Sequence, residues 1–205
     1  MEYETLATTA QVEKTVASLK ANGMEGVVVK NGTEALEKIK EIIPKGVSVM
    51  NGASTTLQQI GFIDYLKDGA HGWDNLHADI IAETDAEKQG ELRKQAILSD
   101  YYLGSVHAIS ETGELVIASN TGSQLPHLVY TSPNLVLVVS TKKITSTTAE
   151  ALKRLETHVI LQEDARMHKV YGIGTTYAKT VILHKENPMM GRQIYVIIVN
   201  EKLGF

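Results

Sequence analysis

The sequence predicts an α/β protein with an open, mostly parallel sheet of about seven strands and helices on both faces. Short β-branched runs alternate along the chain with segments whose apolar residues recur at helical spacing. The run at 135–139 is apolar on both faces, as expected of a central strand covered by helices. A chain of 205 residues can bury a full core, and we expect a single domain over residues 1–205.

The first third of the chain predicts a helix followed by a β-α-β unit. The first helix is expected to begin with Thr9 as its N-cap and to end before Gly23. Strands are expected at 26–29 and 47–50, with a helix between them that begins near Thr33. This order implies parallel pairing of the two strands through a right-handed crossover.

A loop of small residues at 51–56 follows the second strand directly. A helix is expected to begin near Ser54, so its first N–H groups would face any ligand bound there. We therefore predict that Gly52, Ser54 and Thr55 bind an anion, either a carboxylate or a phosphate. The alternative is an ordinary helix cap, because Ser and Thr are favoured at that position without any ligand.

Residues 62–79 show little periodicity and predict a loop over a pocket, in which Trp73 is either a lid or a packing anchor. His71 and His77 are six residues apart, which is not the spacing of a helical metal pair, so we expect no metal site. A capping box that begins at Thr84 predicts the next helix.

The central stretch, residues 99–124, predicts a strand, a turn, a second strand and a polar loop. The turn at 110–113 ends with Gly113, which is free to adopt a positive φ. The polar loop consists of small hydrogen-bonding residues and carries no charge. We predict four ligand-binding residues in and beside this loop: Asn120, Thr121, Gly122 and His127.

The last third predicts one more helix, a polar segment and two strands. The helix is expected to begin at a capping box that starts with Thr147. Residues 162–177 form a polar segment, and strands are expected at 180–183 and 194–199.

Composition narrows the possible partners and cofactors. The net charge of −4 argues against nucleic acid and anionic membranes as partners. The absence of cysteine excludes disulfides and cysteine-ligated iron–sulfur clusters, and no Gly-x-Gly-x-x-Gly fingerprint is present, so no cofactor is evident. The first residues lack the character of a signal peptide, and no apolar run approaches the roughly 20 residues that span a bilayer. We expect a cytoplasmic protein.

Several short motifs occur in a fixed order. They are Glu25-Gly26, the loop at 52–57, the stretches at 99–104 and 108–113, Ser132-Pro133-Asn134 and Lys143-Ile144. In this order they resemble the LUD family, the lactate-utilisation domain found in lactate-utilisation protein C and in stand-alone relatives. The resemblance extends from about residue 24 to residue 205.

The resemblance implies the fold shared by ribose-5-phosphate isomerase, glucosamine-6-phosphate deaminase and the coenzyme A transferases, whose ligands lie at the carboxyl ends of strands. The loop at 52–56 is similar to the phosphate loop of these isomerases, with Ala53 in place of a second glycine. The turn at 110–113 is similar to the Ser-Glu-Asn-Gly turn of the transferases, whose glutamate attacks an acyl thioester. Glu111 is therefore a candidate nucleophile or base, although Thr112 replaces the asparagine. The alternative for Glu111 is a solvated hairpin residue.

Three functions remain open. The first is a LUD-domain protein that binds a small organic acid, or that supports L-lactate oxidation beside iron–sulfur partner proteins. The second is an independent enzyme that acts on an acyl-coenzyme A or sugar-phosphate substrate through Glu111, with coenzyme A present only as substrate. The third is a ligand- or partner-binding protein without catalysis. In each of these three functions the expected partner is a small anionic metabolite or another protein.

Overall fold

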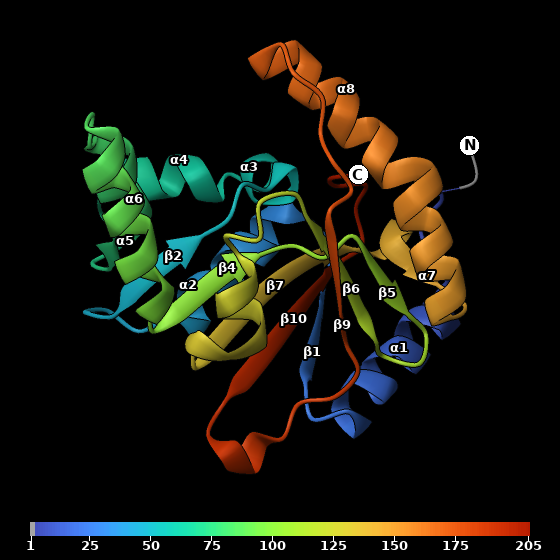
Figure 1. Ribbon diagram of the computed structural model, residues 1–205. Helices are drawn as coiled ribbons and strands as arrows, with labels where there is room; N and C mark the ends of the chain where they lie inside the picture. The colour runs from blue at the N-terminus through green and yellow to red at the C-terminus, as the bar shows by residue number, and fades with distance from the viewer. Residues whose placement is uncertain (1–2) are drawn as a thin grey trace.

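A computed structural model describes residues 3–205 and contains two sheets (Figure 1). Six parallel strands follow the order β1-β10-β7-β4-β2-β3, and four strands form a mixed sheet in the order β8-β5-β6-β9. The parallel sheet comprises β1 (Glu25–Val29), β2 (Ser48–Asn51), β3 (Asp74–Asn75), β4 (Tyr101–Gly104), β7 (Asn134–Ser140) and β10 (Gln193–Val199). The second sheet comprises β5 (Ala108–Ser110), β6 (Leu115–Ser119), β8 (Ile144–Thr145) and β9 (Lys179–Leu183).

Helices connect and cover these strands. They are α1 (Thr9–Ala21), α2 (Gly32–Ile42), α3 (Thr55–Gln59), α4 (Phe62–Lys67), α5 (Leu76–Ala82), α6 (Ala86–Gln95), α7 (Thr148–Arg154) and α8 (Ile160–Tyr171). Short 3₁₀ turns are η1 (Ala96–Leu98), η3 (Thr141–Lys143) and η5 (Pro188–Met190), and π-helical turns are η2 (His127–Thr131) and η4 (Leu155–Val159). Within residues 3–205 no helix has the length and apolar character needed to cross a membrane.

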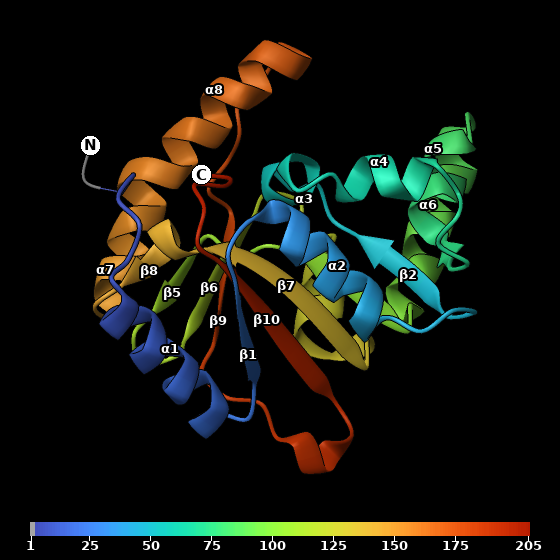
Figure 2. The same ribbon diagram turned by 180° about the vertical axis from the view of Figure 1, so that it is seen from behind.

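Strand β7 lies at the centre of the parallel sheet, between β10 and β4. Val136 and Val138 on one face pack against α2, α3 and α4, and Figure 2 shows α2 lying across this face. Leu135, Leu137 and Val139 on the other face pack against α1 and the second sheet. Both faces of β7 are therefore buried, which confirms the predicted central strand.

The second sheet lies between the parallel sheet and the helix made by α7, η4 and α8 (Figure 1). In β6, Leu115 and Ile117 face the parallel sheet, whereas Val116 and Ala118 face α7 and η4. This alternation explains why β6 is buried along its whole length.

The α/β class and the mostly parallel sheet are confirmed, but the strands are divided between two sheets instead of forming one. Strand β4, which is the short run Tyr-Tyr-Leu-Gly, is not predicted from the sequence. This run is a strand because it pairs with β2 and β7, and such tertiary pairing leaves no local sequence pattern. The prediction also lacks α8, which occupies much of the polar segment and has no buried residue to mark a helical stripe. Trp73 is 8% exposed and belongs to the core, so it is a packing anchor.

The helix caps are correct at two positions and displaced at three. Ser54 caps α3 and Thr147 caps α7, as predicted. The caps of α1, α2 and α6 are Thr8, Asn31 and Asp85 in place of Thr9, Thr33 and Thr84. Several adjacent residues there have comparable capping chemistry, and the path of the chain selects among them.

Candidate functional site

The carboxyl ends of β2, β4 and β7 reach the same edge of the parallel sheet, since these strands are neighbours and parallel. Lys143 lies just beyond β7, at the end of η3, and its side chain is only 3% exposed. Its Nζ atom hydrogen-bonds to Thr56 Oγ1 at 3.2 Å, to Ser105 Oγ at 3.2 Å and to the carbonyl oxygen of Val106 at 3.1 Å. A buried amino group is thus held among hydroxyl groups at the edge where open α/β sheets bind ligands.

Three elements supply this group. Thr56 is on α3 and is 1% exposed, while Ser105 directly follows β4. The Ser105 hydroxyl also donates to Thr56 Oγ1 at 3.3 Å. The lysine and the two hydroxyls consequently form one connected unit, which we name the edge cluster.

The C-terminal segment passes directly over the edge cluster. Gly204 has a φ of +64°, and a Cβ placed on it would lie 2.3 Å from Thr56 Oγ1 and 2.8 Å from Lys143 Nζ. Only glycine permits this close approach. The Gly204 N–H donates to Gln59 Oε1 at 2.6 Å, which fixes the segment against α3. In both views the C-terminus lies between α3 and α8 (Figures 1 and 2).

Positive charge accumulates behind Lys143. Burial lowers the pKa of Lys143 well below its ordinary value, and the charges of Arg154 and Lys142 lower it further. His107 is also buried, and this burial, together with the charges of Lys143 and Arg154, lowers the pKa of His107 to about 3. Nδ1 of His107 accepts a hydrogen bond from the Ala118 N–H at 3.0 Å, which favours the neutral ring. An anion at this edge would relieve the repulsion.

Asn51 and His77 extend the polar surface along the edge. Asn51 ends β2, is 2% exposed, and its Oδ1 lies 3.2 Å from His77 Nδ1 on α5. Burial lowers the pKa of His77, and Arg93 adds to this. Asn51 is also the first residue of the small-residue loop at 51–56.

The predicted loop at 51–56 does lie at the sheet edge, but several of its groups are already bonded. The Gly52 N–H donates to the Leu103 carbonyl oxygen at 3.1 Å. Ser54 Oγ accepts from the Leu57 N–H at 3.2 Å as an ordinary helix cap, and Thr55 is the first residue of α3. Within this loop, the member that contacts Lys143 is Thr56, which the prediction does not include among the ligand-binding residues.

The second predicted loop follows β6 of the other sheet. Ser119 Oγ donates to Gln124 Oε1 at 3.0 Å and accepts from the Gly122 N–H at 2.9 Å. Thr121 bonds to Ser123 at 3.2 Å, and Lys179 Nζ donates to the Asn120 carbonyl oxygen at 3.1 Å. Its hydrogen bonds therefore close the loop on itself and on β9.

His127 lies inside the molecule, on η2. Its Nδ1 is 2.9 Å from Ser132 Oγ and 3.3 Å from Ser99 Oγ, and its ring stacks on Tyr102 with centroids 4.5 Å apart. Burial lowers the pKa of His127 to about 4. Ser132 and Ser99 lie two residues before β7 and β4, so this contact is at the amino ends of the strands, opposite the edge cluster.

Glu111 lies in the β5–β6 turn and faces α1. Its carboxylate accepts from Lys14 Nζ at 2.8 Å and from Gln11 Nε2 at 3.0 Å. These two hydrogen bonds lower the pKa of Glu111 and keep it ionised. The structure gives this carboxylate partners from α1 and does not join it to the edge cluster.

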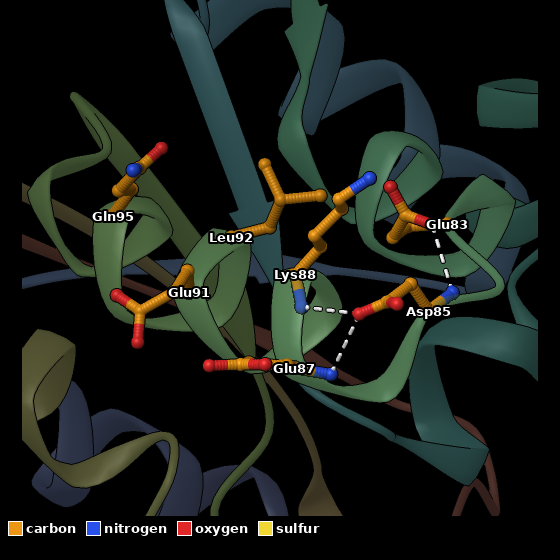
Figure 3. Close-up of a pocket in the computed structure, with 7 residues that line it drawn as sticks. All are labelled: Glu83, Asp85, Glu87, Lys88, Glu91, Leu92 and Gln95. Atoms are coloured by element: carbon orange, nitrogen blue, oxygen red, sulfur yellow. Dashed lines mark hydrogen bonds between the residues drawn. The ribbon is translucent and has the colours of Figure 1, made fainter.

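A surface pocket of about 550 Å³ lies along α6 (Figure 3). Its lining residues are Glu83, Asp85, Glu87, Lys88, Glu91, Leu92 and Gln95. The hydrogen bonds drawn there cap the start of α6: Asp85 Oδ1 accepts from the backbone N–H groups of Glu87 and Lys88. Residues 3–205 contain no group of three or more metal-ligating side chains. We therefore place the candidate site at the edge cluster.

Comparison with known proteins agrees with this architecture. The sequence model of the LUD domain family matches residues 12–199. A solved structure, that of a DUF162 family protein from Deinococcus radiodurans, has a similar fold, with a TM-score of 0.54 and 12% sequence identity over 96% of this chain and 100% of that chain. No curated protein matches. Since the family match covers most of the sequence, this chain belongs to the LUD domain family.

Proposed function

We propose that this LUD-domain protein binds a small anionic metabolite, an organic acid or a phosphate ester, at the edge cluster. The observation that carries the proposal is the buried amino group of Lys143 among the hydroxyls of Thr56 and Ser105. A carboxylate or phosphate oxygen accepts hydrogen bonds from all three groups. In a buried setting such charge-assisted bonds are about twice as strong as neutral ones.

The electrostatics support the same ligand class. Without an anion, the charges of Arg154 and Lys142 disfavour the ammonium form of Lys143. A bound anion favours that form, so binding raises the pKa of Lys143 and takes up a proton. Affinity should accordingly be highest at lower pH and should fall as pH rises through the raised pKa of the complex.

The family resemblance suggests the biological setting. The role in L-lactate oxidation remains part of our proposal, with the organic acid bound here and the electrons carried by iron–sulfur partner proteins. This chain has no cysteine, so any cysteine-ligated cluster belongs to a partner. We expect the purified chain alone to oxidise no lactate with an artificial electron acceptor.

A thermal-shift panel tests the binding proposal. The ligands are L-lactate, pyruvate, free coenzyme A, acetyl-coenzyme A, ribose 5-phosphate and glucosamine 6-phosphate. A ligand at 100 times its dissociation constant adds about 2.7 kcal/mol of stability, a rise of roughly 5–10 °C for a chain of this length. Thr56→Val should reduce the shift, because it removes one hydroxyl and keeps the side-chain shape.

Lys143→Met removes the cation and should abolish the shift while leaving the fold intact. Lys14→Met is the matched control, because it removes a lysine from an exposed ion pair on α1. A ligand shift that survives Lys143→Met unchanged would place the ligand elsewhere and overturn the proposal. The absence of any shift in the wild-type chain would favour the partner-dependent function.

A further inference from the structure

Four buried polar atoms without a hydrogen-bond partner lie in one part of the molecule. They are Arg154 Nε, Arg154 Nη2, Tyr3 Oη and His158 Nε2, and within residues 3–205 the only other such atom is Thr131 Oγ1. Folded proteins pair nearly all of their buried polar groups, and each exception calls for an explanation. Their concentration in one place makes this part of the molecule a candidate binding site.

Lys142, Arg154 and His158 form a basic cluster that holds the carboxylate of Glu4. Lys142 Nζ donates to Glu4 Oε2 at 2.9 Å and to Oε1 at 3.1 Å. His158 Nε2 lies 3.3 Å from Glu4 Oε1, an ion pair when the imidazole ring is protonated. Burial opposes ionisation of Glu4, but the bonds from Lys142 outweigh it and lower the pKa of Glu4. A negative group is therefore already seated on the cluster.

Glu4 leaves much of the cluster unused. Arg154 is fully buried, and its Nη1 donates to the His107 carbonyl oxygen. Its remaining Nε and Nη2 groups form one edge of the guanidinium, the edge that matches two oxygens of a carboxylate or phosphate. The Tyr3 ring covers this region, with its centroid 5.7 Å from Arg154 Cζ and 5.4 Å from the His158 ring.

A surface pocket borders the cluster at Lys142 and Tyr3. A pocket of about 280 Å³ opens beside it, lined by Tyr3, Thr5, Lys142, Ile144, Thr145, Ser146 and Glu150. His158 belongs to the π-helical turn η4, which begins directly after Arg154. Such turns interrupt α-helices and frequently occur at functional sites.

We propose that the basic cluster binds a tetrahedral oxyanion, inorganic phosphate or the phosphate group of a small metabolite, in place of the Glu4 carboxylate. A carboxylate has two oxygens, and both are engaged by Lys142. A tetrahedral anion has four, enough to meet Lys142 and the free edge of Arg154 together. This site is separate from the edge cluster, because Lys142 bonds to Glu4 whereas Lys143 bonds to Thr56 and Ser105.

Calorimetric titration of the full chain with inorganic phosphate, and in parallel with ribose 5-phosphate, tests this proposal. Glu4→Gln removes the competing charge and should tighten phosphate binding several-fold. Lys142→Met should weaken it at least about tenfold, as expected when a charge-assisted hydrogen bond is lost. His158→Gln provides a second weakened variant if Lys142→Met fails to fold. Tighter binding of the sugar phosphate than of inorganic phosphate would identify a metabolite as the source.

Glu186→Gln is the matched control, because Glu186 is in another half-buried ion pair, 3.0 Å from Arg192. It should leave phosphate affinity unchanged within about twofold. Thr56→Val, which disrupts the edge cluster, should also leave it unchanged, so failure of this proposal is distinguishable from failure of the first. Equal affinities in Glu4→Gln and Glu186→Gln, no phosphate binding by either wild type or Glu4→Gln, or loss of binding in Thr56→Val would overturn the inference.

Discussion

Lys143 holds an ionisable amine inside the molecule, so its protonation is linked to folding. Its pKa in the folded chain lies below the ordinary value of 10.5. At pH values between the folded-state pKa and 10.5, the unfolded chain binds more protons than the folded chain. The wild-type free energy of unfolding therefore rises with pH across this window. Urea unfolding at pH 7, 8 and 9 should show this rise in the wild type and a flatter profile in Lys143→Met. Parallel profiles for the two proteins would contradict the linkage.

Glu111 makes a different kind of contact, an ion pair with Lys14, whose side chain is 59% exposed. Pairs of this type contribute little, so Glu111→Gln should cost at most about 1 kcal/mol in urea unfolding at neutral pH. The pKa of Glu111 is lowered, so this contribution should vanish as pH falls through that value. We also expect unchanged ligand shifts. A borohydride-reducible thioester on Glu111 after treatment with acetyl-coenzyme A would contradict this and favour the transferase-like alternative.

Among the elements, the β5–β6 hairpin depends on a close contact with α1. Gly113 has a φ of +91°, and a Cβ there would lie 3.0 Å from the Ser18 carbonyl carbon. Gly113→Ala should therefore cost about 2 kcal/mol or more in urea unfolding, through both backbone strain and the clash. Gly46→Ala is the control, since Gly46 has a similar φ of +83° and nothing within 4 Å of the added methyl. Equal costs would show that the contact contributes nothing.

Elements with a strong local signal are predictable from the sequence, and those that depend on pairing are not. An unbroken apolar run predicts strand β7, and a run of small residues predicts the loop at 51–56. Strand β4 gains its strand character from β2 and β7, which no local pattern reveals. The division into two sheets is likewise tertiary, because a buried strand has the same composition in either sheet.

Only part of the candidate site can be predicted from the sequence. The sequence indicates the loop that contains Thr56 and the position of Lys143 after an apolar strand. Ser105 and Gly204 carry no chemical signature of their own, and their importance comes from their distances to Lys143 and Thr56. A lysine after a strand is usually solvated, and only the packing around Lys143 shows that it is buried.

For the whole molecule, two buried histidines contribute to the response to acid. The pKa values of His127 and His107 fall from 6.5 to about 4 and about 3. The unfolded chain binds protons first as pH drops, so stability should decline from about pH 6.5 to pH 4. His127 alone should account for up to about 3 kcal/mol. His127→Gln should show a shallower decline in urea unfolding over this range, and an identical slope would contradict the assignment.

The C-terminal segment that contains Gly204 also has a kinetic consequence. It lies within contact of Lys143 and Thr56, so a ligand that reaches both must first displace it. Association at the edge cluster then includes a conformational opening of the C-terminal segment, and the rate of this opening does not depend on ligand concentration. In stopped-flow mixing the observed rate should level off at high ligand concentration, and the plateau measures how fast the chain uncovers its own buried lysine.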